Sequence, residues 1–292
     1  MRPWHRAPLP WPRFMTALRA AFVVALLLIL AGLAVTWSAP SSANVTVATT
    51  TSARDSGLLD YLLPFFSEET GIGVRYVAVG TGQALDMGRR GDADVVIVHS
   101  PIEEAVFLAE GHGLCRSVVM QNEFLVVGPP SDPAGIRGLD NATVALGRIL
   151  AVRAPFVSRG DNSGTHLLER RIWSWVGYQP TPVAEPWYRE AGQGMAATLQ
   201  IASELEGYTL TDSGTYAVYR TSLRLEIDVK NDPPLQNYYS VIPVNPVIHP
   251  GTNVDGAVAL AKWLVSPRGQ ALIAGYEVNG QPIFHPIGQD GC

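Results

Sequence analysis

Charged residues and cysteines are scarce in this chain of 292 residues. Only 16% of the residues are charged, 47% are hydrophobic, and cysteine occurs twice. This composition excludes a disordered chain and suits one large domain or two ordinary ones. Two cysteines exclude a disulfide-dense scaffold, and the six histidines form neither an i, i+4 pair nor a Cys–His cluster. We therefore expect no metal cation and no cofactor.

Residues 1–43 differ in composition from the rest. They carry four arginines and no acid, an apolar run at 20–37, and small residues just before and at Ala43. This order is typical of a secretory signal, with cleavage expected after Ala43. The 18-residue run is also long enough to act as a membrane anchor if it is retained. Either way, we expect the remainder to work in the periplasm or elsewhere outside the cytoplasm.

The remainder has little positive charge. Without the four arginines of residues 1–43 it has 17 basic and 26 acidic side chains, a formal charge of −9. This balance argues against a nucleic acid or an anionic membrane surface as partner. A bound anion would have to be attracted by local donors. Export permits a disulfide, but the sequence leaves open whether Cys115 and Cys292 pair.

Hydrophobic patterning predicts alternating strands and helices. Strands are expected at 45–49, 74–79, 94–98, 124–127, 152–157 and 208–211. Helices are expected at 58–66, 84–90, 102–109, 166–176, 195–205 and 254–273, the last with a break near 266–269. Residues 231–250 contain five prolines and are interpreted as irregular or extended chain.

This alternation predicts an α/β protein with mostly parallel sheets and flanking helices. The simplest arrangement has two lobes, with 44–127 plus 241–292 in the first and 128–240 in the second.

Polar and glycine residues gather at three strand-to-helix junctions. The first is T49-T-T-S52 and the second is G80-T-G82. Hydroxyls there can cap a helix, and glycines allow the backbone to approach a ligand closely. Capping and an ordinary turn are the simpler explanations for each junction alone. The second is neither a Walker loop nor a dinucleotide fingerprint, because the required residues do not follow.

The third junction is S158-R-G-D-N-S-G-T-H166. Its arginine, Arg159, can present forked donors to a tetrahedral oxyanion. Ligands of open α/β sheets bind at the carboxyl ends of strands, where helix N-termini favour anions. Three such junctions together predict a small anion held between two lobes.

These segments resemble the tungstate-binding proteins of bacterial ABC importers, within the type II periplasmic binding-protein class. The resemblance covers residues 44–292 and also includes D55-S-G-L-L-D60, G91-D-A-D-V95, N122-E-F-L-V-V-G128 and Y208-T-L-T-D212. It implies a two-lobed fold with the ligand in the cleft. It also implies capture of tungstate, or of molybdate, and delivery to a membrane permease driven by an ATPase subunit. We expect a monomer and no catalytic activity.

The resemblance assigns the ligand contacts by position. Arg159 is the cationic contact, and hydroxyl residues complete the set: Thr50, Thr51, Ser52, Thr81, Ser163 and Thr165. Strand alternation would place Thr50 and Ser52 on one face and Thr49 and Thr51 on the other. Which of the three threonines faces the ligand stays open.

Alternatives remain. A phosphate-binding protein of the same class would gain from an acceptor, for which Asp161 or Asp212 could serve, although Asp161 could instead orient Arg159. A secreted serine hydrolase would use Ser163 with His166 or His99 as its base. The tripeptide Arg159–Asp161, which recurs at Arg90–Asp92, also matches an adhesion motif, which would need to be exposed.

Overall fold

The computed structural model describes residues 44–292. The predicted signal or anchor at residues 1–43, including the run at 20–37, lies outside the described residues. Within the described range, no helix combines the length and the apolar character needed to cross a bilayer.

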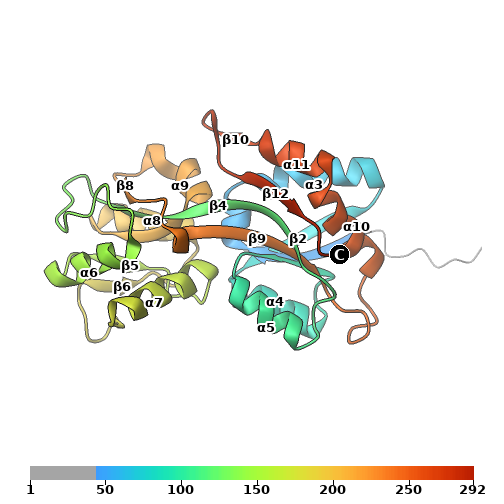
Figure 1. Ribbon diagram of the computed structural model, residues 1–292, viewed down its shortest axis with the longest axis horizontal. Helices are drawn as coiled ribbons and strands as arrows, with labels where there is room; N and C mark the ends of the chain where they lie inside the picture. Colours follow the sequence, from blue (N-terminus) through green and yellow to red (C-terminus); the bar gives the residue numbers. More distant parts are fainter. Residues whose placement is uncertain (1–43) are drawn as a thin grey trace, which may run out of the picture. The chain divides into compact units, whose positions relative to one another are not determined.

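Helices and strands alternate through most of the described range (Figure 1). The helices are α2 (Thr51–Asp55), α3 (Leu58–Thr70), α4 (Thr81–Arg90), α5 (Pro101–Ala109), α6 (Ala142–Val152), α7 (Gly164–Val176), α8 (Met195–Glu204), α9 (Ser213–Tyr219), α10 (Val254–Val265) and α11 (Pro267–Ala274), with 3₁₀ turns η1 (Arg220–Ser222) and η2 (Pro233–Leu235). The strands are β1 (Asn44–Thr50), β2 (Gly73–Val79), β3 (Val95–Val98), β4 (Ser117–Gly128), β5 (Phe156–Ser158), β6 (Tyr188–Glu190), β7 (Thr209–Asp212), β8 (Glu226–Val229), β9 (Gln236–Pro243), β10 (Glu277–Val278), β11 (Gln281–Pro282) and β12 (His285–Gln289).

The main sheet is mixed, so the expectation of mostly parallel sheets was wrong. Its strand order is β12-β4-β9-β3-β1-β2, and β7 and β8 pair with the far end of β4. Strand β1 is parallel to β2 and β3, and β5 is parallel to β6. Strand β9 is antiparallel to both β3 and β4. The chain leaves along β4 and returns beside it along β9, and this path requires antiparallel pairing.

Several elements differ from the sequence expectation. Strand β4 begins at Ser117, seven residues before the predicted strand, and helix α6 was not predicted. The proline-rich segment 231–250 contains β9, because its prolines lie in η2, at the last position of β9 or beyond it. A proline is tolerated at such positions. The predicted break near 266–269 is confirmed, since the Ser266 hydroxyl caps α11 and Pro267 is its first residue.

Two sets of buried apolar residues define two lobes. The first lobe contains core residues from 45–120 and 239–284, and the second contains core residues from 124–235. Figure 1 shows β4 and β9 running from one lobe to the other. The boundaries at 127/128 and 240/241 stay a prediction. The core residues favour crossing points nearer the start of β9 and the middle of β4, between Met120 and Phe124.

The C-terminal residue is tied to the start of β4. Cys115 and Cys292 form a disulfide with a Cα–Cα distance of 5.2 Å across 177 residues of sequence. The question that the sequence left open is thus answered by the structure. Strand β12, just before Cys292, pairs with β4 in the same region.

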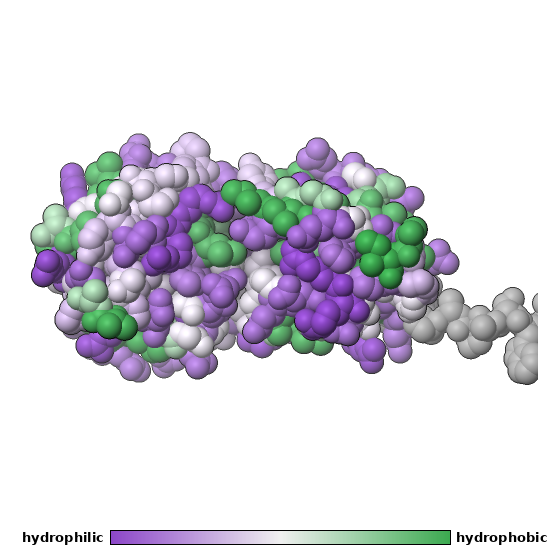
Figure 2. All heavy atoms as spheres, turned by 90° about the horizontal axis from the view of Figure 1, so that it is seen from below, coloured by the Kyte–Doolittle hydropathy of each residue, from purple (hydrophilic) through white to green (hydrophobic). Residues whose placement is uncertain are grey.

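Charged residues at the end of α4 contribute to a hydrophilic surface. Figure 2 shows the molecule from below, where hydrophilic areas surround several separate apolar areas. Arg89 there forms ion pairs with Asp86 and Glu110, and Arg90 pairs with Asp92. Such exposed pairs contribute little to stability and keep the face hydrated.

Candidate functional site

The β1–α2 junction presents its hydroxyls in different directions. Thr49 donates its hydroxyl to the carbonyl of Ile97 at 2.9 Å, which fixes it to β3. The Thr50 hydroxyl accepts from the Ala53 amide at 3.2 Å and caps α2. Strand β1 ends at Thr50, so the expected alternation does not continue to Thr51 and Ser52. Both of these residues instead contact one side chain of the second lobe.

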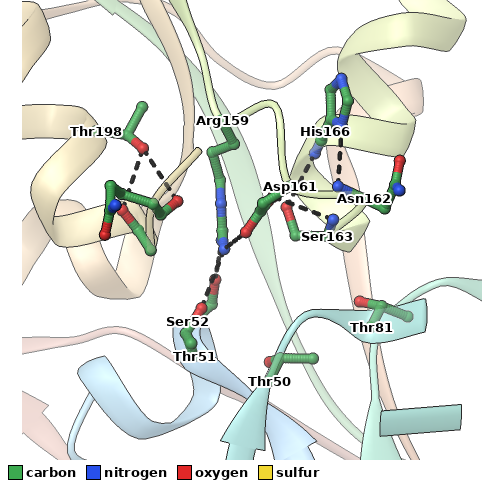
Figure 3. A network of polar contacts seen from close by, with 12 residues as sticks. Thr50, Thr51, Ser52, Thr81, Arg159, Asp161, Asn162, Ser163, His166 and Thr198 are labelled. Atoms are coloured by element: carbon green, nitrogen blue, oxygen red, sulfur yellow. Dashed lines mark hydrogen bonds and ion pairs between the residues drawn. The ribbon is translucent and has the colours of Figure 1, made fainter. Parts of the chain in front are cut away.

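That side chain is Arg159, which joins the two lobes. It follows β5, is 1% exposed, and donates to Ser52 Oγ at 3.2 Å and to Thr51 Oγ1 at 3.0 Å. Figure 3 shows its guanidinium reaching the start of α2. The guanidinium Nε is buried and has no hydrogen-bond partner among the described residues. Buried donors without a partner are costly, so this nitrogen is available to an acceptor that enters the site.

Asp161 positions both Arg159 and its own loop. Its Oδ2 pairs with the Arg159 guanidinium, and its Oδ1 accepts from the Ser163 amide at 3.1 Å. These bonds confirm the interpretation that Asp161 orients Arg159. They also require a tight loop, in which Gly160 and Asn162 have φ of 63° and 55°. Arg159 is buried, so the copy of the tripeptide at this loop is not exposed to an adhesion receptor.

The α4 and α7 N-termini meet between the lobes. The Gly164 amide of α7 donates to Thr81 Oγ1 of α4 at 2.9 Å. Ser163 caps α7 by accepting from the His166 amide, and Thr165 Oγ1 is buried without a partner among the described residues. All seven residues predicted as ligand contacts therefore lie at the three junctions. Direct hydrogen bonds connect these junctions in the fold. Arg159 connects the first junction to the third, and Thr81 connects the second to the third.

A buried amide network beside this site was not predicted from the sequence. His99 Nδ1 lies 2.9 Å from Asn237 Oδ1, and Asn237 Nδ2 donates to Asn122 Oδ1 at 2.7 Å. The His99 ring also stacks on Tyr239 at 4.6 Å between centroids. Burial lowers the pKa of His99 to about 4, so the ring is neutral at physiological pH. No motif links these residues, which lie on β4, β9 and the end of β3.

The side chain of Glu169, on α7, is hydrogen-bonded to residues beside the Arg159 loop. Its fully buried Oε1 accepts from Tyr188 at 2.8 Å and from Trp173 at 3.2 Å. The carboxyl also bonds the hydroxyl of Ser158, the residue before Arg159. Burial raises the pKa of Glu169 to about 7, because these neutral partners only partly stabilise the anion.

Glu169→Gln is expected to remove a pH-dependent loss of stability. The folded protein keeps this proton up to about pH 7, whereas the unfolded chain releases it near its ordinary value of 4.5, so stability falls as pH rises through this window. Over this pH range the free energy of unfolding of the wild type should fall by up to about 3 kcal/mol more than that of the variant. Urea unfolding of both proteins at several pH values measures the difference. Parallel curves for the two proteins would contradict the assignment.

The serine hydrolase arrangement does not form in the described part of the chain. The Ser163 hydroxyl caps α7, and the ring Nδ1 of His166 accepts from the Asn162 amide at 3.1 Å. His99 is bonded to Asn237. Neither ring is hydrogen-bonded to Ser163. Residues 44–292 also contain no cluster of three histidine, cysteine or carboxylate side chains suited to a metal ion.

Neither acidic residue considered for phosphate is a free acceptor. Asp161 is engaged by Arg159 and Ser163, and Asp212 accepts from both the amide and the hydroxyl of Thr215 at 2.8 Å. Burial raises the pKa of Asp212 above its usual value, whereas these bonds to Thr215 and the charge of Arg159 lower it. The other groups at the three junctions are the Arg159 guanidinium, hydroxyls and backbone amides, all of which can donate hydrogen bonds. A donor set of this kind suits a fully ionised oxyanion.

Two α/β lobes that bring donor-rich helix starts together define a solute-binding protein of the periplasmic class. Comparison with known proteins agrees, since the PBP superfamily domain matches residues 35–268. The chain is 47% identical to "Tungstate-binding protein TupA" of Peptoclostridium acidaminophilum, over 83% of this chain and 85% of that protein. It is 45% identical to "Putative ABC transporter anion-binding protein" of Haloferax volcanii, over 84% and 72% of the respective chains.

Solved structures agree with these relatives. The tungstate-binding protein TupA from Desulfovibrio alaskensis G20 matches with a TM-score of 0.72 and 44% identity, covering 84% of this chain and 98% of that one. The tungstate ABC transporter structure from Geobacter sulfurreducens matches with a TM-score of 0.73 and 42% identity, covering 80% and 98%. The chain therefore belongs to the PBP superfamily and, within it, to the family of the TupA tungstate-binding proteins.

Proposed function

We propose that this chain is the extracytoplasmic solute-binding component of an ABC importer that captures tungstate. The observation that carries this proposal is the contact of Arg159 with Thr51 and Ser52 across the two lobes, in a chain whose relatives are named for tungstate binding. The partners would be a membrane permease and its ATPase subunit, as expected for a protein related to ABC transporter binding components.

Hydrogen-bond donors alone can supply the affinity. Tungstate is a dianion at neutral pH and requires donors rather than acceptors. Charge-assisted hydrogen bonds contribute about 1.5–3 kcal/mol each. About six of them would reach nanomolar affinity, about −12 kcal/mol, after the losses of association. Neither a metal cation nor a cofactor is needed for this binding.

The choice between oxyanions rests on charge and size. Phosphate carries a proton near neutral pH, and the bonds of Asp161 and Asp212 leave little capacity to accept it. Sulfate has shorter bonds than tungstate, so its oxygens would fall short of donors spaced for the larger ion. Molybdate has the same charge and nearly the same size as tungstate, and we propose that it binds as well.

Titration calorimetry with four oxyanions tests the proposed function. Tungstate is expected to bind with a sub-micromolar Kd, and sulfate and phosphate at least about 100-fold more weakly, a difference of about 3 kcal/mol. Molybdate should fall close to tungstate. Sub-micromolar binding of phosphate alone would instead identify a phosphate-binding protein. Turnover of an ester or peptide without any oxyanion binding would favour the hydrolase that uses Ser163.

A further inference from the structure

Gly80 brings the two lobes into backbone contact. It is the N-cap of α4 in the first lobe, and a Cβ built on it would lie 3.2 Å from the carbonyl oxygen of Asp161 in the second lobe. Real Cβ atoms rarely come this close to another atom, so any side chain here would push against backbone. Figure 3 shows the loop of Asp161 and Ser163 above the start of α4, which Thr81 marks.

Gly164, the residue after Ser163, forms a second close approach between the lobes. It is the first residue of α7, and a Cβ built on it would lie 3.2 Å from both Thr81 Oγ1 and His99 Cε1 of the first lobe. The Gly164 amide also donates the hydrogen bond to Thr81. The absence of side chains at Gly80 and Gly164 therefore allows the N-termini of α4 and α7 to come together.

The atoms opposite these two glycines cannot move away easily. The Asp161 side chain is bonded to Arg159 and to the Ser163 amide, which fixes the loop that carries its carbonyl. The His99 ring is bonded to Asn237 and stacked on Tyr239. An added methyl group would thus be accommodated by separating the lobes rather than by local adjustment.

Another glycine at the same interface is loosely packed. Gly194 is the N-cap of α8 in the second lobe and, like Gly80, has extended backbone and no side-chain cap. A Cβ built on Gly194 would lie 3.7 Å from Thr51 of the first lobe, an ordinary van der Waals distance. The contact at Gly194 is therefore looser than those at Gly80 and Gly164, and Gly194 provides a matched comparison.

We propose that Gly80 and Gly164 determine the affinity and size selectivity of the anion site, because they set the spacing between its donors on the two lobes. This inference rests on the proposed function and extends it to residues that offer no side chain. A separation of a few tenths of an ångström would lengthen the bonds that cross the interface, now 2.9–3.2 Å long. Hydrogen bonds weaken beyond about 3.2 Å, so the bound anion would lose several donors together.

Alanine at either glycine is the direct test. Gly80→Ala and Gly164→Ala should each weaken tungstate binding at least about tenfold, mainly through faster dissociation, because the donors no longer converge. Gly194→Ala adds the same methyl group at a matched helix N-cap, and its Kd should stay within about twofold of the wild type. Calorimetry gives the affinities, stopped-flow tryptophan fluorescence gives the dissociation rates, and thermal unfolding confirms that each variant is folded.

Gly80→Ser separates steric contact from helix capping. Alanine is a poor N-cap and serine a good one, so a capping effect would disappear in Gly80→Ser. A steric effect would persist, because serine also carries a Cβ. If the wild type binds tungstate tightly and both Gly80→Ser and Gly164→Ala keep the wild-type affinity, the inference is overturned. A wild type that binds no oxyanion would instead reject the proposed function, and the inference with it.

Discussion

Arg159→Ala is expected to weaken tungstate binding about 100-fold, because it removes charge-assisted bonds worth about 3 kcal/mol together. The loss has a second cause. Asp161 now pairs with this guanidinium, and without it a carboxylate would face the incoming dianion unpaired. Calorimetry at two salt concentrations measures the change. The control is Arg189→Ala, an exposed arginine on the neighbouring strand β6, which should leave the Kd unchanged.

Two further variants separate the contributions of Arg159. Arg159→Lys keeps the charge but replaces a planar fork with a single ammonium, which cannot contact Thr51 and Ser52 in the same geometry. Its affinity should fall between those of the wild type and Arg159→Ala. Adding Asp161→Asn to Arg159→Ala should restore part of the affinity, because the unpaired carboxylate is then gone. Unchanged tungstate binding in Arg159→Ala would place the site elsewhere in the chain.

Loss of the Cys115–Cys292 disulfide is expected to lower the free energy of unfolding by about 3–5 kcal/mol. The bond closes a loop with a sequence separation of 177 residues, which restricts the unfolded chain strongly. It also fixes the end of the chain beside β4, with which β12 pairs. Urea unfolding of the wild type and of the double variant Cys115→Ala/Cys292→Ala measures the difference.

Reductant provides the control for this disulfide prediction. It should destabilise the wild type to the level of the double variant and leave the double variant itself unaffected. A difference in unfolding free energy below about 0.5 kcal/mol would mean that the bond restrains the chain little, as happens when the unfolded state is already compact.

Local pattern predicted most elements of the fold but not their pairing. Strands such as β3, with four buried aliphatic residues, were recognisable from hydrophobicity alone. Strand direction was not, because antiparallel pairing of β9 with β3 and β4 depends on where the chain returns after a long excursion. Strand β9 itself was obscured by flanking prolines, which suggested irregular chain.

For the site too, the sequence predicted the local contacts but not the distant ones. The three junctions were predicted because hydroxyls and glycines at the end of a strand have a local chemical meaning. The orientation of Asp161 toward Arg159 was also predicted, because a bare carboxylate facing a dianion would repel it. The network of His99, Asn237 and Asn122 was not, because Asn237 is 138 positions from His99 and 115 from Asn122, and the three residues match no motif. Only the tertiary fold brings them together.

The continuity of β4 and β9 bears on how the anion would enter and leave. Both strands run from one lobe to the other and are hydrogen-bonded together from Ser117 to Glu123. Parting the lobes must therefore twist a paired ribbon instead of pivoting about a slack linker. Such a ribbon resists torsion, so the stiffness of β4 and β9 would limit how far the lobes could part.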